Sequence, residues 1–158
     1  MKKTALLFPL VFLLASFLPA GTRYYTKTGQ ITFFSETPAE NIAARNTRVS
    51  SVLDPATGKI EFSALIKSFV FQKALMQEHF NENIMESDTY PKASFAGFVL
   101  NIKDINLTKD GAYNAKVEGE LTIHGVTKKI TEAAAFTVAG GKISAHAVFN
   151  VACADYNM

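Results

Sequence analysis

The chain has 158 residues and a formal net charge of +2, and Lys2 and Lys3 account for that excess, so the remainder is formally neutral. This length fits one domain, and a neutral domain lacks the basic face that nucleic-acid binding usually needs. The single cysteine, Cys153, excludes an internal disulfide, so an apolar core must hold the domain together.

Residues 1–20 have the layout of a secretory signal peptide. A positively charged start precedes the uncharged apolar run from Thr4 to Phe17, and the small residue Ala20 follows. The alternative is a membrane anchor, but the run is shorter than the roughly 20 residues that span a bilayer. We therefore expect cleavage near residue 20, a domain over residues 21–158, no stable membrane insertion afterwards, and a periplasmic or secreted protein.

Short extended segments separated by turns make up most of the domain. They are rich in Thr, Val, Ile, Phe and Tyr, which favour strands. The predicted strands run from Tyr24 to Phe34, Ile42 to Leu53, Ile60 to Phe71, Ser94 to Ile105, Tyr113 to Ile123, Val126 to Val138 and Lys142 to Val151. The predicted turns are Asp54 to Gly58, Lys109 to Gly111, His124-Gly125 and Gly140-Gly141.

One segment has helical periodicity. One stretch, residues 72–86, repeats at spacings of three and four through Leu75, Met76, His79, Phe80, Asn83 and Ile84, which predicts the only helix of the domain. Seven strands with tight turns indicate an all-β fold, an antiparallel sandwich or barrel. A seven-stranded up-and-down barrel has two open edges, so either the barrel is open or a last strand is missing.

No catalytic motif stands out. Glu78 and Glu82 are four residues apart on the predicted helix, a spacing that solvated glutamates share with carboxylate pairs. We expect Cys153 to be buried as a small apolar residue. The histidines lack the spacing of a metal pair; they are His79, His124 and His146. The sequence therefore predicts no enzyme, no metal site and no cofactor.

Alternation within the predicted strands indicates which side chains face inward. The inferred lining consists of Phe95, Val99, Tyr113, Val117, Leu121, Ile130, Ala134, Phe136, Ala145, Ala147 and Phe149. Large aromatic residues alternate here with alanines, and small side chains leave volume that an apolar ligand can occupy. The alternative is that the alanines let the helix pack close to the sheet. Composition favours neither explanation over the other.

Two stretches of the chain resemble the YceI-like family. The first runs from Phe71 to Ser87 (FQKALMQEHFNENIMES) and continues with YPKASFAG from Tyr90; the second is GELTIHGVTK from Gly119 to Lys128. The resemblance extends from about Tyr24 to Tyr156. It implies an exported bacterial protein with a lipocalin-like, eight-stranded, antiparallel up-and-down barrel, and it implies an elongated cavity for a polyisoprenoid or another long amphiphilic lipid. The family defines no catalytic residues.

The chain differs from the family pattern in its first strands, Gly29 to Ser35 and Asn41 to Asn46, so ligand contacts there cannot be transferred. The stretch Ala154-Asp155-Tyr156 matches a family segment that a last strand normally follows. The resemblance thus leaves two alternatives, a natural chain that extends beyond Met158 or a barrel without that strand.

The first functional hypothesis is a protein that binds a long-chain lipid for transport, storage or protection outside the cytoplasm. The alternatives are a solidly packed barrel that acts through surface contacts with proteins, and an enzyme acting on a lipid substrate. The sequence is also compatible with a homodimer.

Overall fold

The computed structural model describes residues 22–36 and 41–158. Its strands are β1 (Tyr24–Glu36), β2 (Asn41–Leu53), β3 (Lys59–Leu65), β4 (Val70–Phe71), β5 (Lys92–Val99), β6 (Gly111–Ile123), β7 (Val126–Ala139) and β8 (Lys142–His146). The helix α1 (Ala74–His79) continues into a π-helical turn, Phe80–Ile84. Short 3₁₀ turns lie at Ile66–Ser68, Ile102–Asp104 and Cys153–Tyr156.

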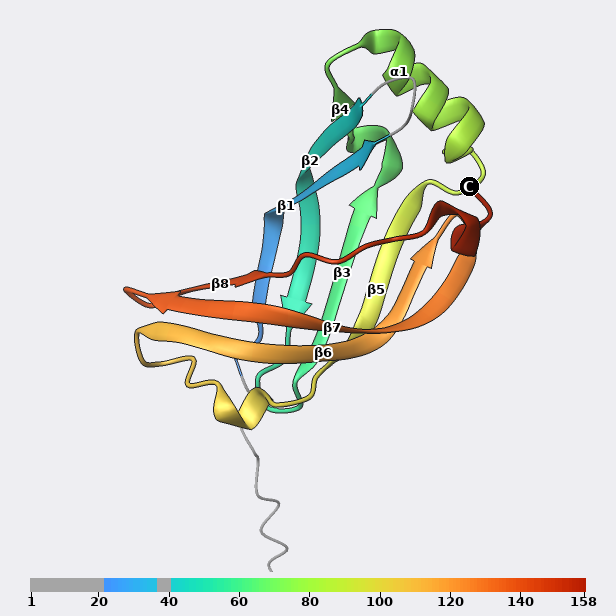
Figure 1. Ribbon diagram of the computed structural model, residues 1–158. Helices are drawn as coiled ribbons and strands as arrows, with labels where there is room; N and C mark the ends of the chain where they lie inside the picture. Colours follow the sequence, from blue (N-terminus) through green and yellow to red (C-terminus); the bar gives the residue numbers. More distant parts are fainter. Residues whose placement is uncertain (1–21, 37–40) are drawn as a thin grey trace, which may run out of the picture.

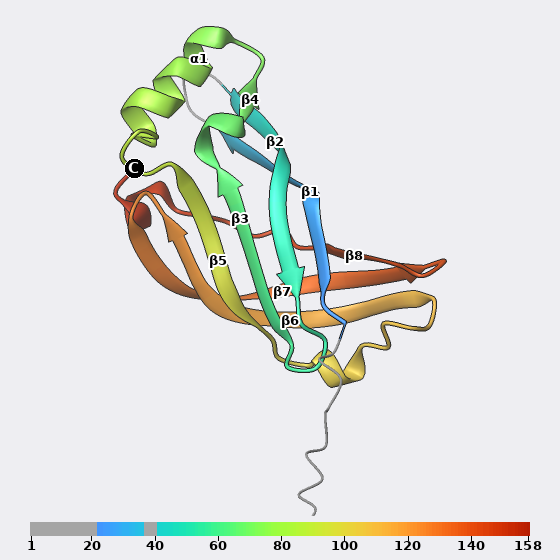
Figure 2. The same ribbon diagram turned by 180° about the vertical axis from the view of Figure 1, so that it is seen from behind.

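All strands belong to one antiparallel sheet, which is curled into a half-barrel (Figure 1). The order is β1-β2-β3-β5-β6-β7-β8, and β4 pairs with β2 away from this path. Among the described residues β1 does not pair with β8, so the barrel is open on that side (Figure 2). The predicted all-β up-and-down architecture with one helix is confirmed, in an open form.

The two-residue turns of the last two hairpins were correctly predicted. His124 and Gly125 join β6 to β7 with φ values of 50° and 73°, and Gly140 and Gly141 join β7 to β8 with φ values of 55° and 76°. Two consecutive positive φ angles are typical of type I′ turns, whose twist matches that of the flanking strands. Glycine adopts such angles without steric cost, which explains its place in both turns.

The predicted strand from Ile60 to Phe71 is interrupted: β3 ends at Leu65, and Val70–Phe71 form the separate strand β4. The Asn46 side chain donates a hydrogen bond to the Leu65 carbonyl over 3.0 Å, and the Ile66 amide donates to the Pro91 carbonyl over 2.9 Å. The chain leaves β3 at this point and turns through a 3₁₀ segment that buries Ile66 and Phe69. Burial of these two side chains breaks the extended run.

The predicted strand from Ser94 to Ile105 ends early, at Val99. Residues 100–110 form a long connection that contains the 3₁₀ turn at Ile102–Asp104, so the tight hairpin predicted at Lys109 to Gly111 is wrong. Ile105 is buried and Leu107 packs against the same apolar cluster, which explains the detour.

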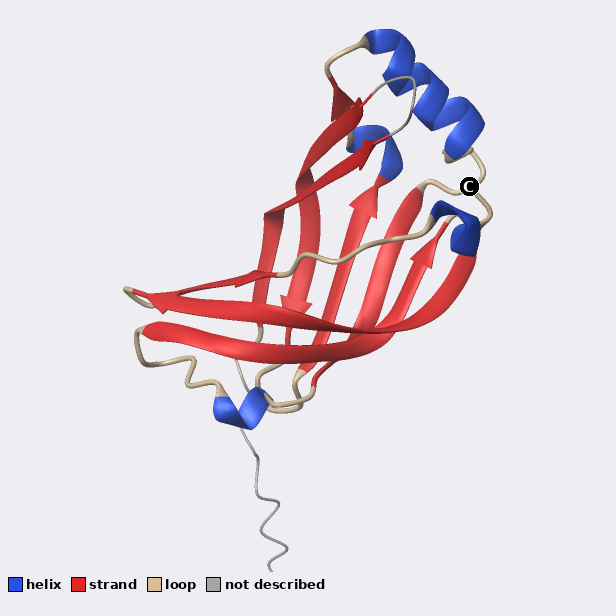
Figure 3. Cartoon of the chain, in the orientation of Figure 1, coloured by secondary structure: helices blue, strands red, loops and turns tan. Residues whose placement is uncertain are grey.

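The predicted last strand, Lys142 to Val151, ends at His146. Residues 147–152 follow β8 without pairing with β7, and they cross the concave side of the half-barrel as a loop (Figure 3), which lies in front of the sheet in Figure 1 and behind it in Figure 2. Phe149 packs against the core residues Phe95, Leu121 and Tyr156. Contact of this ring with the core accounts for the departure from the sheet.

Candidate functional site

The candidate site is the concave face of the half-barrel, the side of the sheet to which Leu53, Ile60, Val99, Leu121 and Phe136 point. Residues opposite each other on neighbouring antiparallel strands point to the same side of a sheet. The strand register therefore continues this face across the sheet in rows. One such row joins Phe62, Phe95 and Leu121.

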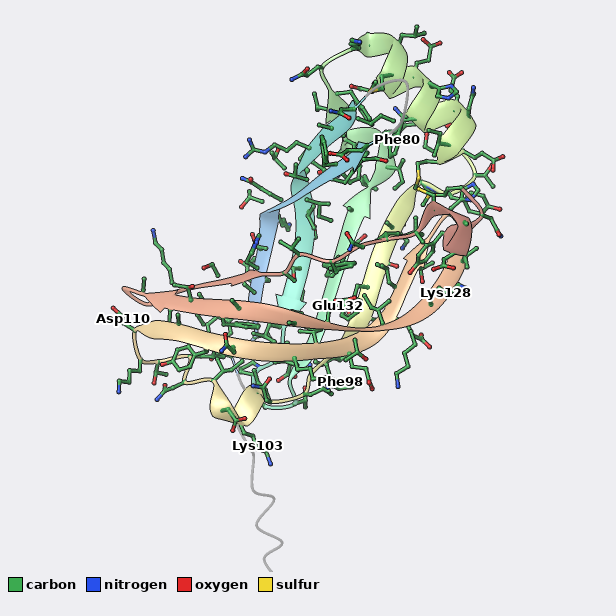
Figure 4. All side chains as sticks on the ribbon, viewed as in Figure 1. Phe80, Phe98, Lys103, Asp110, Lys128 and Glu132 are labelled. Atoms are coloured by element: carbon green, nitrogen blue, oxygen red, sulfur yellow. The ribbon has the colours of Figure 1, made fainter. Side chains whose placement is uncertain are left out.

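Four phenylalanine rings fill the helix end of the concave face, and we call this region the aromatic end. The Phe80 ring lies 4.9 Å from Phe71, 5.5 Å from Phe33 and 5.9 Å from Phe69, measured between centroids. Phe80 comes from the π-helical turn that follows α1 (Figure 4), and Met76 and Ile84 pack against the same cluster. The aromatic end is thus closed by side chains.

In the middle of the face the Phe95 ring lies over two glycines. A Cβ atom at Gly97 or Gly119 would come within 2.8 or 2.7 Å of the Phe95 Cζ atom. The two glycines are paired across β5 and β6, so together they provide the space that the ring occupies. The Phe62 ring stacks on Phe95 at 5.1 Å. Both glycines serve packing here.

A third cluster closes the end opposite the helix. Ile102, Ile105 and Leu107 of the connection 100–110 pack with residues of β2, β5, β6 and β7. The connection therefore covers this end as the helix covers the other.

The structure brings together nine of the predicted lining residues. Phe95, Val99, Leu121 and Phe136 are buried, and the half-buried members of the same clusters are Tyr113, Val117, Ile130, Ala134 and Phe149. Ala145 and Ala147 are exposed. Ala145 pairs with Phe136, so it points to the concave side although little covers it. We call Ala145, Ala147 and Val148, with the segment that carries them, the open side.

The helix does not explain the alanines of the later strands. It packs on the aromatic end with Ala44 and Ala93, whereas Ala115 and Ala134 lie in the cluster at the opposite end. Close approach of a helix is therefore not the reason for small side chains in β6, β7 and β8.

Two charged residues on the concave face were missed by the sequence analysis. Lys128 pairs with Leu121 and Glu132 pairs with Val117, so both point to the apolar side of β7. The sequence pattern could have identified both residues, because alternation from Val126 to Val138 places the even-numbered residues on one face. Only the apolar members of that set entered the prediction.

A polar contact joins three segments at the helix end. The His124 ring lies between Glu86, with Nε2 to Oε2 at 2.8 Å, and the Tyr156 carbonyl, with Nδ1 to oxygen at 3.2 Å. The Tyr90 ring packs edge-on against it at 4.5 Å. Both ring nitrogens thus face oxygen atoms of other segments. Burial raises the pKa of the Tyr156 phenol, and the Asp155 carboxylate adds to that effect.

The remaining candidates from the sequence lie apart from the concave face. Glu78 and Glu82 are exposed on the helix, and His146 is exposed on β8. Cys153 is exposed, so its predicted burial is wrong; the 3₁₀ turn at Cys153–Tyr156 buries the Tyr156 ring instead. The described residues contain no group of three or more His, Cys, Asp or Glu side chains arranged to hold a metal.

A pocket of about 480 Å³ lies between the β2–β3 turn and the start of the connection after β5. It is lined by Ala56, Thr57 and residues 98–104, and Val99 is the one predicted lining residue that borders it.

No helix within the described ranges is long and apolar enough to cross a membrane.

Comparison with known protein families identifies the fold. Residues 23–158 match the model of the YceI-like domain, which is nearly all of the described chain. The chain belongs to the YceI-like family. The resemblance found in the sequence is thereby confirmed, although none of the curated proteins compared with the chain is significantly similar to it.

Solved structures show the same fold. A polyisoprenoid-binding domain from Saccharophagus degradans has a TM-score of 0.72 and 16% identity, with 85% of this chain and 80% of that chain covered. BcnA from Burkholderia cenocepacia has a TM-score of 0.52 at 14% identity, over 84% of this chain and 71% of that one. The YceI protein of Campylobacter jejuni has a TM-score of 0.51 at 18% identity, over 99% and 85%.

Proposed function

We propose that this protein binds a long apolar lipid, a polyisoprenoid or a fatty amphiphile, against the concave face of the half-barrel. The observation that carries this proposal is the combination of an apolar concave face with an open side: apolar residues line the face, yet Ala145 and Ala147 at the open side remain exposed. Membership in the YceI-like family supports the same ligand class. So does the likeness of this chain to the polyisoprenoid-binding domain from Saccharophagus degradans.

The energetics favour a ligand of this kind. Each buried methylene contributes roughly 0.8 kcal/mol, so a long chain can bind firmly without a specific polar contact. The loop 147–152 crosses the concave face and contacts the core through Phe149, while the neighbouring Val148 is 80% exposed. A lipid lying between this loop and the sheet would cover apolar surface on both. The protein would then act as a carrier or store of the lipid and not as an enzyme.

The cellular setting belongs to the same proposal. Residues 1–20, which lie outside the described residues, would direct export and be removed, leaving a periplasmic or secreted protein. N-terminal sequencing of the protein from its host checks this point. An intact Met1 on membrane-bound protein would contradict it.

Native mass spectrometry of the exported protein, followed by lipid extraction, tests the binding itself. We expect the wild type to carry a long-chain lipid and Ala145→Phe to lose it, because the new ring would stand on the concave side opposite Phe136. Ser144→Phe is the matched control: Ser144 precedes Ala145 in β8 and points to the outer side. We expect this variant to keep the lipid.

A wild type that carries no lipid when isolated from its host, and takes up none when offered polyisoprenoids or fatty amphiphiles, would overturn the proposal. The solid barrel acting through its surface would then be the better account. Equal loss of lipid in both variants would show that the site is not on the concave face.

A further inference from the structure

Glu132 lies in an unusual place on the concave face. Its row across the sheet contains Val117, which is half-buried, and Val99, which is 1% exposed. Its neighbours on the same side of β7 are Ile130 and Ala134, which pack in two different apolar clusters. Figure 4 shows Glu132 midway along β7. A carboxylate therefore stands where two stretches of apolar lining meet.

This carboxylate has no protein partner among the described residues. It is half-buried, and neither a hydrogen bond nor an ion pair to it is found there. A carboxylate that loses water without gaining a donor costs free energy. A lipid chain covering Val117 would also cover Glu132, since the two side chains are direct neighbours. A purely apolar chain would therefore remove water from this carboxylate without supplying a hydrogen-bond donor.

Edge protection is the competing explanation. β8 pairs with β7 only from Ala135 to Ala139, so the earlier part of β7 is an edge strand. Inward-pointing charges on an edge strand discourage pairing with other molecules. This explanation suits Lys128, which is exposed near the start of β7. It accounts less well for Glu132, which lies between the two apolar clusters.

We propose that Glu132 determines the head-group specificity of the lipid site, selecting single-chain amphiphiles whose polar group is an ammonium over those with a carboxylate. This inference rests on the proposed lipid binding. A carboxylate only accepts hydrogen bonds, so it pairs with a donor and repels an anion. An ammonium group satisfies the charge as well as the hydrogen bond, and an alcohol satisfies the hydrogen bond alone.

The test compares three probes with the same alkyl chain: dodecylamine, dodecanol and sodium dodecanoate. Titration of the full wild-type domain, with delipidation beforehand, measures their affinities by calorimetry. We expect the amine to bind about tenfold more tightly than the carboxylate, the size of one charge-assisted hydrogen bond. This ranking in the wild type requires no variant, so it remains informative even if a substitution impairs folding.

Glu132→Gln then assigns the preference to this residue. The amide keeps the size of the side chain and removes the charge, so we expect the ratio between amine and carboxylate to fall to about twofold. The control is Glu120→Gln on the outer face of β6, where the register opposes Glu120 to Lys129 and Ala96. We expect the control to keep the wild-type ratio.

The outcomes distinguish a failure of the Glu132 specificity role from a failure of lipid binding. If none of the probes binds although the wild type carries a longer lipid, the specificity role alone is overturned. If the wild type neither carries nor takes up any lipid, lipid binding itself fails and the inference fails with it. If all three bind but Glu132→Gln leaves their ratio unchanged, lipid binding stands and the specificity role is overturned. An unchanged ratio together with increased light scattering would assign Glu132 to edge protection.

Discussion

The aromatic end and the open side belong to the same concave face but are built differently. At the aromatic end four phenylalanine rings lie within 5.9 Å of Phe80 or of each other, and the helix covers them. At the open side β8 pairs with β7 over only five residues, and its small side chains remain exposed. At the aromatic end the apolar side chains pack against one another and stabilise the fold. At the open side the apolar side chains stay exposed and are available to a ligand. Stability and binding should therefore respond to different substitutions.

The largest loss of stability is expected at the aromatic end. Phe80→Ala would remove a ring that is 9% exposed and contacts Phe33, Phe69 and Phe71. We expect the free energy of unfolding to fall by about 3–5 kcal/mol, the usual range for such a deletion. Chemical denaturation measures it. Leu75→Ala, one turn away on the helix and 77% exposed, serves as the control with an effect below about 0.5 kcal/mol.

Enlarging an alanine at each region gives the sharpest comparison. Ala44 is 3% exposed and pairs with both Phe33 and Phe71, so Ala44→Phe should cost about 1–3 kcal/mol by overpacking. Ala145→Phe should change the free energy of unfolding by less than about 0.5 kcal/mol, because the site is exposed. Denaturant titration of the two lipid-free variants measures both. Similar losses would mean that the open side is as tightly packed as the aromatic end.

The contact of His124 with Glu86 and Tyr156 should have an intermediate effect. His124→Asn keeps a residue that tolerates the positive φ of 50° but removes the ring between the two acceptors. We expect a loss of about 1–2 kcal/mol, measured by thermal unfolding. Glu86→Gln keeps an acceptor for the ring and should cost less. No loss in the His124 variant would show that the 3₁₀ turn at Cys153–Tyr156 holds its place without this contact.

The smallest effect is expected on the outer face, away from both regions. The Lys129 side chain, 3.0 Å away, and the Thr131 hydroxyl lower the pKa of Glu118 from its usual value of 4.5. A lowered folded-state pKa gives stability that is present above the unfolded pKa and is lost as pH falls through the folded value. Glu118→Gln should therefore slightly reduce stability at pH 7 and not at pH 2. A larger loss at pH 2 than at pH 7 would contradict this sign.

The open side was predicted from the sequence less accurately than the rest of the fold. Phe95, Val99, Leu121 and Phe136, which alternation predicts to face inward, are buried, because strand period alone decides which face a side chain takes. The same rule, applied only to apolar residues, passed over Lys128 and Glu132. It also extended the last strand to Val151, since nothing in the local pattern shows that Phe149 leaves β7 to join the core.

By itself the sequence determined the strand faces, the turns of the last two hairpins and the helix, since these depend on residues close together in the chain. Gly125 and Gly140 illustrate this, because their positive φ angles need only the local chain. The tertiary structure alone decided where the barrel stays open, how Asn46 ends β3, and why Cys153 is exposed while Tyr156 is buried. These features depend on contacts between residues far apart in the chain, and such contacts leave no local period to read.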